Sequence, residues 1–217
     1  MSTAVKICGV TRIEDALAAA HCGAHAIGLV FYRPSPRYVD VDKAAAIVRA
    51  LPPFVTPVGL FVDAPAEEVR SISARAGVQL IQFHGSEPPD FCAQFGLPYM
   101  RAVRVRPEVD LLQYARDFHG AQALLLDAYH EGLQGGTGAT FDWALIPPSL
   151  PLAVVLSGGL NPDNVREAVR RVKPWAVDVS SGVEASKGIK DAAKIAAFIS
   201  GVRDVDRCEG PGGVSAS

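Results

Sequence analysis

The 217-residue sequence has no long hydrophobic run and no excess of charge of one sign. A membrane-spanning helix needs about 18 or more consecutive apolar residues, and no stretch approaches that length. The 21 basic and 23 acidic residues give a net charge of -2 and are scattered along the chain. Without a basic cluster to attract nucleic acid or an anionic membrane, we expect neither as a partner and expect small molecules instead.

Cysteine is also scarce, with four residues, Cys8, Cys22, Cys92 and Cys208. Their spacing is not that of metal ligands, and a disulfide scaffold has a much higher cysteine density. We therefore expect free thiols and no metal site. The N-terminus lacks a basic region followed by a hydrophobic one and a cleavage site, so the expected location is the cytoplasm.

What the sequence does contain is typical of a folded, water-soluble domain. Hydrophobic residues make up 49% and charged residues 20%, close to average globular usage. The length suits one large domain, since parallel barrels form single units from about 200 residues upward. We expect this domain to span residues 1–203, with a flexible tail at 204–217 that ends in Gly and Ser.

Short apolar runs alternate with amphipathic segments along the chain, the pattern of a parallel sheet covered by helices. The predicted strands are Ala4–Cys8, Ala26–Phe31, Thr56–Val62, Val78–Phe83, Tyr99–Val105, Ala123–Asp127, Ala153–Leu156 and Ala176–Val179. The predicted helices are Ile13–Cys22, Val41–Leu51, Ala66–Ala76, Pro89–Phe95, Glu108–Phe118, Phe141–Ile146, Pro162–Val172 and Ile189–Val202. Gly23 and Gly77 stand where helices should end, and Pro162 suits a first helical turn.

Eight β-α units in about 200 residues predict a closed (β/α)₈ barrel, because right-handed crossovers leave few other arrangements. An open doubly wound sheet is the alternative. It normally has fewer strands and carries its ligand signature after the first strand rather than after the last two.

The active site of such a barrel lies at the C-terminal ends of its strands. Polar residues gather at these predicted ends, with one more, Arg37, in the loop after the second strand. They are Lys6, Cys8, Gln82, His84, Arg104, Asp127, Asp178 and Ser180.

The last two strands end in serine- and glycine-rich turns, where barrels of this kind bind phosphate through backbone N–H groups and a helix N-terminus. We therefore predict a phosphate site formed by Gly158, Gly159, Ser180, Ser181 and Gly182. The alternative is that the glycines serve only the turns. Another run, Gly135-Gly136-Thr137-Gly138, lacks the ending of a nucleotide P-loop and is interpreted as a mobile loop that covers the substrate.

Seven sequence blocks, taken together, carry a family resemblance. They are Lys6-Ile7-Cys8-Gly9, Ser35-Pro36-Arg37-Tyr38, Gln82-Phe83-His84-Gly85, Leu126-Asp127-Ala128, Gly135-Gly136-Thr137-Gly138 with Phe141-Asp142-Trp143, Ser157-Gly158-Gly159-Leu160, and Asp178-Val179-Ser180-Ser181-Gly182-Val183-Glu184. In this order the blocks resemble the phosphoribosylanthranilate isomerase family over nearly the whole chain.

The resemblance implies an Amadori rearrangement in tryptophan biosynthesis, which converts N-(5-phosphoribosyl)anthranilate to 1-(2-carboxyphenylamino)-1-deoxyribulose 5-phosphate without metal or cofactor. It implies that Asp127 is the general acid and Cys8 the general base, and that Arg37 binds the anthranilate carboxylate. A guanidinium suits a carboxylate because it forms two parallel hydrogen bonds. Gln82, His84 and Asp178 are expected to bind substrate, although His84 as a packed loop residue and Asp178 as the partner of Lys6 are alternatives.

These roles require shifted pKa values, since the ordinary values are about 3.9 for Asp and about 8.5 for Cys. The pKa of Asp127 has to rise toward neutrality, by desolvation and a neighbouring negative charge. We expect Lys6, on the same strand face as Cys8, to favour the thiolate and lower the pKa of Cys8. The two groups are expected to titrate as a coupled pair.

Two rival functions stay open at this point. A sugar-phosphate isomerase of histidine biosynthesis has the same barrel and the same type of rearrangement. Resemblance to that family would require a pair of aspartates, one on strand one and one on strand five. This chain has Cys8 on strand one and only arginines on strand five. A non-catalytic phosphate-binding barrel is the other rival, and the presence of Cys8 and Asp127 argues against it. The protein is expected to be a monomer or a homodimer.

Overall fold

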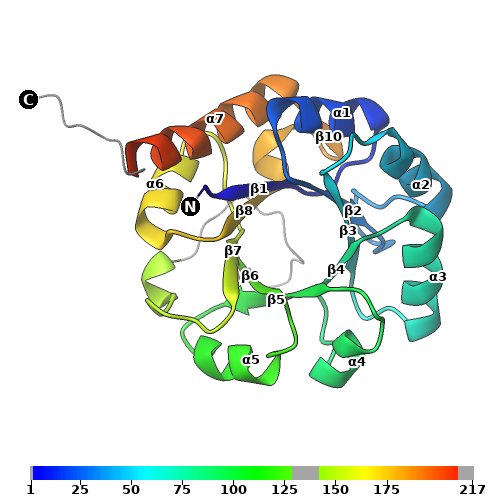
Figure 1. Cartoon of the computed structure of the whole chain (residues 1–217), viewed down its shortest axis with the longest axis horizontal. Helices are drawn as coiled ribbons and strands as arrows, with labels where there is room; N and C mark the ends of the chain where they lie inside the picture. Colours follow the sequence, from blue (N-terminus) through cyan, green and yellow to red (C-terminus); the bar gives the residue numbers. More distant parts are fainter. Residues whose placement is uncertain (1, 129–141, 210–217) are drawn as a thin grey trace, which may run out of the picture.

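The computed structural model describes residues 2–128 and 142–209. Eight parallel strands close into a barrel in chain order, and the helices surround it (Figure 1). The predicted (β/α)₈ barrel is therefore confirmed, and the open sheet is excluded. The barrel strands are β1 (Ala4–Ile7), β2 (Ala26–Val30), β3 (Thr56–Phe61), β4 (Leu80–Phe83), β5 (Tyr99–Val105), β6 (Ala123–Ala128), β7 (Ala153–Leu156) and β8 (Ala176–Val179).

The barrel encloses small and medium apolar side chains from alternate strand positions, because successive residues of a strand face opposite sides of the sheet. Val58 of β3, Met100 and Ala102 of β5, and Leu125 of β6 belong to this inner cluster. The neighbouring residues Val103 and Leu124 pack instead in an outer cluster with residues of the surrounding helices. Both faces of the strands are therefore buried, as the apolar strand sequences predict.

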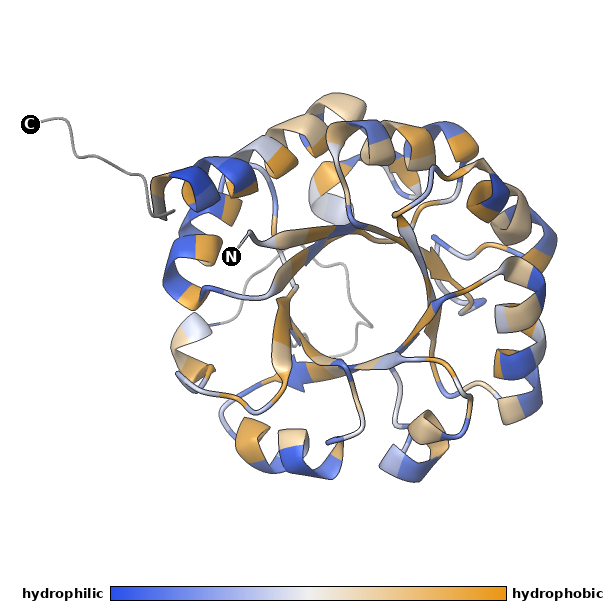
Figure 2. Ribbon diagram, in the orientation of Figure 1, coloured by the Kyte–Doolittle hydropathy of each residue, from blue (hydrophilic) through white to orange (hydrophobic). Residues whose placement is uncertain are grey.

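The helices are α1 (Ile13–Cys22), α2 (Val41–Ala50), α3 (Ala66–Ala76), α4 (Pro89–Ala93), α5 (Leu111–Asp117), α6 (Val165–Val172) and α7 (Ala192–Glu209). Hydrophobic and hydrophilic residues alternate along them in Figure 2, as expected of helices with one face on the strands. Gly23 and Gly77 end α1 and α3 with φ of 96° and 75°, a left-handed conformation that glycine adopts without strain.

Four predicted helices differ clearly in the structure, three of them before the last one. The segment expected to form the sixth helix contains only a single 3₁₀ turn, Trp143–Leu145, among its described residues. Helix α6 begins at Val165 rather than Pro162, because the Asn161 side chain accepts hydrogen bonds from the backbone N–H groups of Asp163 and Asn164 and holds a turn before it. Helix α5 begins at Leu111, after the capping side chain of Asp110.

The last predicted helix, Ile189–Val202, is wrong at both ends. Two short antiparallel strands, β9 (Glu184–Ser186) and β10 (Ile189–Lys190), precede it. Helix α7 then begins at Ala192, where Asp191 Oδ1 accepts from the N–H groups of Ala193 and Lys194. These capping bonds explain why the helix starts after the aspartate.

Helix α7 also continues to Glu209, which corrects the expected start of a flexible tail at residue 204. Val205 is buried, and both carboxylate oxygens of Asp206 accept hydrogen bonds from Thr3, at 2.8 and 2.9 Å. Asp206 therefore connects this end of α7 to Thr3, the residue before β1. Residues 210–217 lie outside the described residues. Within residues 2–128 and 142–209, no helix has the length and apolar character required to span a membrane.

Candidate active site

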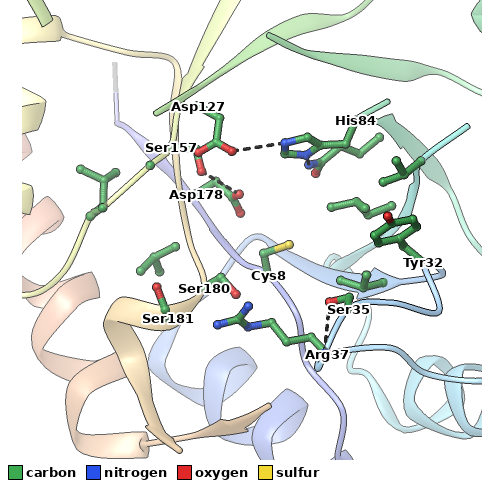
Figure 3. Close-up of a pocket in the computed structure, with 18 residues that line it drawn as sticks. Cys8, Tyr32, Ser35, Arg37, His84, Asp127, Ser157, Asp178, Ser180 and Ser181 are labelled. Atoms are coloured by element: carbon green, nitrogen blue, oxygen red, sulfur yellow. Dashed lines mark hydrogen bonds and ion pairs between the residues drawn. The ribbon is translucent and has the colours of Figure 1, made fainter. Parts of the chain in front are cut away.

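A pocket lies at the C-terminal ends of the strands and collects most of the predicted site residues (Figure 3). Its walls are made of polar residues together with the apolar side chains of Val30, Leu60, Val62 and Leu160. The predicted site residues that line it are Cys8, Arg37, Gln82, His84, Asp127, Gly158, Gly159, Asp178, Ser180 and Ser181. Of the residues that were assigned a role in catalysis, substrate binding or phosphate binding, Gly182 is the one that does not line this pocket.

Cys8 follows β1 at the base of the pocket and is 6% exposed. Its backbone N–H donates to the carbonyl oxygen of Val179, which anchors it beside β8. A Cβ on Gly28 of the neighbouring strand would lie 2.8 Å from the Cys8 sulfur, so glycine leaves room for the thiol. Cys8 is thus held in one place, with its sulfur toward the cavity (Figure 3).

The pKa of Cys8 is shifted opposite to our expectation. Burial raises the pKa of the Cys8 thiol, and the nearby Lys6 opposes that shift without cancelling it. Lys6 Nζ lies 2.8 Å from Asp178 Oδ1, and Asp178 itself raises the pKa of Cys8. Burial lowers the pKa of Lys6, but Asp178 and Cys8 outweigh burial and raise it. Because its charge is shared with a carboxylate, Lys6 does not produce a low-pKa thiol in this pocket.

Asp127 is the next-to-last residue of β6 and is 5% exposed. Its Oδ1 accepts from the N–H of Ala128 at 3.0 Å, and its Oδ2 lies 3.2 Å from His84 Nε2 (Figure 3). Gln82 Nε2 lies 3.1 Å from His84 Nδ1, so the amide can donate to that ring nitrogen. This arrangement favours the tautomer that carries its proton on Nε2, facing Asp127.

Arg37 lies in the loop after β2, and Glu184 holds it in place. Arg37 Nε and Nη2 donate to the two oxygens of Glu184 at 2.7 and 2.9 Å. Gly9, with a φ of 69°, passes so close to Arg37 Cδ that any side chain there would collide with it. The two-bond contact fixes the plane of the guanidinium and leaves its remaining N–H groups for a ligand.

Glu184 and Lys190 have no role predicted from the sequence, yet they connect two sides of the pocket. Lys190 Nζ lies 3.0 Å from Glu184 Oε1 and donates to the carbonyl oxygen of Ser180 at 3.1 Å. Burial raises the pKa of Glu184, but Arg37 and Lys190 outweigh burial and lower it. Glu184 is the last residue of the seventh block of the family resemblance, but its partner Arg37 is 147 residues away in sequence, so the contact could not be predicted.

The loops after β7 and β8 form another wall of the pocket. Gly158 and Gly159 have φ of 83° and 68°, and a Cβ on Gly158 would collide with the backbone of Ala128. Gly182 serves the packing of the two loops, because a Cβ there would collide with the carbonyl oxygen of Leu160. The segment after β8 continues as the 3₁₀ turn Ser181–Val183 rather than an α-helix. A 3₁₀ turn of this length lacks the dipole of a longer helix, and binding of a phosphate at this wall stays a prediction.

Other expected positions fall elsewhere. Arg104 pairs in register with Asp127 but is not among the lining residues of this pocket. The Gly135–Gly138 run lies outside the described residues. Tyr32 and Ser35, for which the sequence predicted no role, also line the pocket, and Ser35 Oγ accepts from the backbone N–H of Arg37. In the described part of the chain, no three His, Cys, Asp or Glu residues are grouped so as to hold a metal ion; the expectations of no metal and no cofactor stay predictions.

The chain is similar to known proteins over most of its length. Residues 5–201 match the family model described as N-(5'phosphoribosyl)anthranilate (PRA) isomerase. A protein of that name from Nitrosospira multiformis is 60% identical over 202 residues, which cover 93% of this chain and 97% of the relative.

Two solved structures agree. A phosphoribosyl anthranilate isomerase in complex with reduced 1-(o-carboxyphenylamino)-1-deoxyribulose 5-phosphate superposes with a TM-score of 0.83 at 40% identity, covering 93% of this chain and 99% of that one. The isomerase from Thermotoga maritima has a TM-score of 0.86 at 41% identity, with the same coverage of both chains. This chain therefore belongs to the N-(5'-phosphoribosyl)anthranilate isomerase family.

Proposed function

We propose that Cys8 is the general base and Asp127 the general acid of the reaction that this chain catalyses, the Amadori rearrangement of N-(5'-phosphoribosyl)anthranilate in tryptophan biosynthesis. One observation supports this most strongly. The thiol of Cys8, just after β1, and the carboxyl group of Asp127 in β6 line one pocket. The same pocket is lined by Arg37, which Glu184 holds through two hydrogen bonds, and by the glycine- and serine-rich loops after β7 and β8.

The reaction needs one proton given and one proton taken. Asp127 donates to the ring oxygen of the ribose, the bond between that oxygen and the first sugar carbon breaks, and an iminium forms at that carbon. Cys8 as thiolate then removes the proton from the second sugar carbon, which yields an enolamine. Protonation of the first carbon and loss of the hydroxyl proton at the second give the amino ketone, 1-(2-carboxyphenylamino)-1-deoxyribulose 5-phosphate. The first carbon is reduced and the second oxidised, so no external oxidant or reductant is needed.

The raised pKa of Cys8 has a consequence for this role. The thiol is the major form at neutral pH in the ligand-free pocket, so only a small fraction of molecules carries the base. That fraction is a stronger base than an ordinary thiolate, because a higher pKa means a greater proton affinity. The expected coupled titration of Cys8 and Asp127 stays a prediction.

The rest of the pocket suits the other parts of the substrate. We assign the anthranilate carboxylate to Arg37 and the phosphate to the loops that carry Gly158, Gly159, Ser180 and Ser181, with Gly182 packing them together. Asp178 accepts from Ser157 Oγ at 3.2 Å and from Lys6, so we assign it to holding Lys6 rather than to a ribose hydroxyl. His84 lies beside Asp127 and Gln82 beside His84, and we assign both to the ribose.

The wild-type protein and one variant test the assignment in a fluorescence assay that follows the consumption of freshly made phosphoribosylanthranilate. Wild type should consume the substrate without added metal or cofactor. Asp127→Asn should lose turnover by about 100-fold or more, the scale of general acid catalysis, while retaining the fold by circular dichroism. A near-normal rate in that variant would refute the role of Asp127. An inactive wild type would instead favour a non-catalytic phosphate-binding barrel.

The partner of this site is a small phosphorylated molecule. The isomerase from Thermotoga maritima is described as dimeric; for this chain, monomer or homodimer stays a prediction, to be decided by sedimentation.

The cytoplasmic location and the absence of nucleic acid and membrane partners likewise stay predictions. A barrel over residues 1–209, six residues longer than expected, is the domain that we propose.

A further inference from the structure

A buried ion pair lies outside the pocket, on the far side of the wall that carries His84. Arg101 of β5 and Glu87, in the loop after β4, are each 4% exposed, and Arg101 Nη1 lies 2.8 Å from Glu87 Oε2. Neither residue is among those lining the described pocket. Taking two charges out of water is expensive, and replacing such a pair by apolar side chains is often neutral or stabilising. Stability alone is therefore a weak reason for this pair.

The remaining hydrogen-bonding groups of the pair converge on the backbone around His84. Arg101 Nη1 donates to the carbonyl oxygen of Phe83 at 3.2 Å, and Nη2 donates to that of Gly85 at 2.8 Å. Glu87 Oε2 accepts from the N–H of Gly85 at 2.9 Å. The residues before and after His84 are thus both bound by the same ion pair.

Glu87 also ties this loop to the one after β3. Its Oε1 accepts from the N–H of Asp63 at 2.8 Å, and Asp63 Oδ1 accepts from the N–H of Ser86 at 2.6 Å. Asp63 has a φ of 50°, and Gly85 passes so close to it that a Cβ on Gly85 would collide with its carboxylate. These contacts make Asp63 part of the same network.

The Arg101 side chain is itself held in one orientation. Its Nε donates to the Tyr114 hydroxyl at 2.9 Å, and its guanidinium stacks over the rings of Tyr114 and Phe118, at 5.9 and 5.1 Å from their centres. The network therefore runs from helix α5 through β5 to the two loops. A lysine at position 101 would keep the charge but lose this planar, multiply bonded geometry.

We propose that the Glu87–Arg101 pair is a positioning element of the active site, which sets the place of the His84 imidazole relative to Asp127 by holding the loops after β3 and β4. The proposal rests on the proposed function, since Asp127 is its general acid. His84 Nε2 lies 3.2 Å from Asp127 Oδ2, so a small displacement of the loop changes that contact directly. A misplacement of about 1 Å can cost about 100-fold in rate.

The test is a double-mutant cycle with Arg101→Lys and His84→Ala, measured by turnover of phosphoribosylanthranilate. Arg101→Lys should lower kcat by about 10- to 100-fold. In the His84→Ala background it should cause no further loss, because the pair acts through that imidazole. Imidazole ¹⁵N chemical shifts of His84 in Arg101→Lys provide a second readout, which needs no activity and should change with the loop. Arg75→Lys is the matched control, since Arg75 forms an exposed ion pair with Asp42 and should leave every readout unchanged.

Glu87→Gln is the second variant if Arg101→Lys does not fold, because it keeps the side-chain shape and should show the same pattern. Unchanged kcat and unchanged His84 shifts in a folded variant would overturn the proposal and leave the pair a structural element. The proposal would also be overturned if the double variant lost as much kcat as the product of the two single-variant losses, because the two residues would then act independently. An inactive wild type would refute the proposed function and not this inference, which the His84 shifts would still decide.

Discussion

At the scale of single residues, the pocket shows how burial and charge set the chemistry of one thiol. Lys6 lies near enough to Cys8 to stabilise a thiolate, but its charge also pairs with Asp178 at 2.8 Å. Desolvation of the charged form then dominates, and the pKa of Cys8 is raised. The sequence places Lys6 on the right strand face but cannot show that a carboxylate 172 residues away shares its charge.

The raised pKa of Cys8 leads to the first prediction. A raised pKa means that the thiolate appears only at higher pH, so alkylation of Cys8 by iodoacetamide should have a higher midpoint pH than alkylation of a small free thiol such as glutathione. The base-dependent limb of the rate profile should rise over the same pH range. Mass spectrometry of the labelled Cys8 peptide, with glutathione in the same sample, measures both midpoints. A midpoint for Cys8 at or below that of glutathione would contradict the shift.

At the scale of elements, side chains from one loop form hydrogen bonds and ion pairs with loops from distant parts of the chain. The β9–β10 pair carries Glu184 and Lys190 to the loop that holds Arg37 and to the backbone of Ser180. The proposed carboxylate site and the proposed phosphate site are thus connected by one glutamate-lysine pair. Lys190, which we expected within the last helix, lies in β10 instead.

Glu184→Gln should raise the KM for phosphoribosylanthranilate by about tenfold, with kcat little changed. Tenfold corresponds to about 1.4 kcal/mol, the scale of one charge-assisted hydrogen bond, and contacts made equally before and during the reaction affect KM alone. Steady-state kinetics measure the split. Glu167→Gln, at an exposed ion pair of α6, is the control. A loss in kcat with constant KM would show that Arg37 is not merely a binding residue.

The start of α7 supports a prediction on stability. Asp191 accepts from two backbone N–H groups of the first turn, so Asp191→Ala should lower the free energy of unfolding by about 1 kcal/mol. Urea denaturation measures this. The exposed Asp163, whose side chain accepts no hydrogen bond among those described, gives the matched variant Asp163→Ala, for which we expect little change. Equal effects of the two variants would refute the capping role.

Much of the fold could be predicted because strand and helix periodicity is local information. All eight barrel strands lie within two residues of their predicted bounds, and Gly23 and Gly77 end helices as expected. Errors arose where a side chain caps a turn, as at Asn161 and Asp191, since aspartate and asparagine are common in both loops and helix starts. The site residues were found at strand ends, whereas Glu87, Arg101 and Glu184 were missed because their roles depend on partners that only the fold reveals.

At the scale of the whole molecule, barrel closure is what makes the site. Ring closure pairs β1 with β8, which places Lys6 in register with Asp178 and brings Cys8 next to the loops of the last two strands. Asp127 arrives from β6, across the same mouth (Figure 3). Neither half of the chain contains the site alone, so catalysis depends on the closed barrel.

The central claim is that a thiolate at position 8 removes the sugar proton. The most direct measurement compares turnover and ligand binding in Cys8→Ser, using the assay for phosphoribosylanthranilate and calorimetry with reduced 1-(o-carboxyphenylamino)-1-deoxyribulose 5-phosphate. A serine hydroxyl is a far weaker acid than a thiol, so we predict that turnover falls by about 100-fold or more while affinity for the analogue stays within a few-fold of wild type. A variant that binds the analogue and still turns over at a near-normal rate would contradict the account.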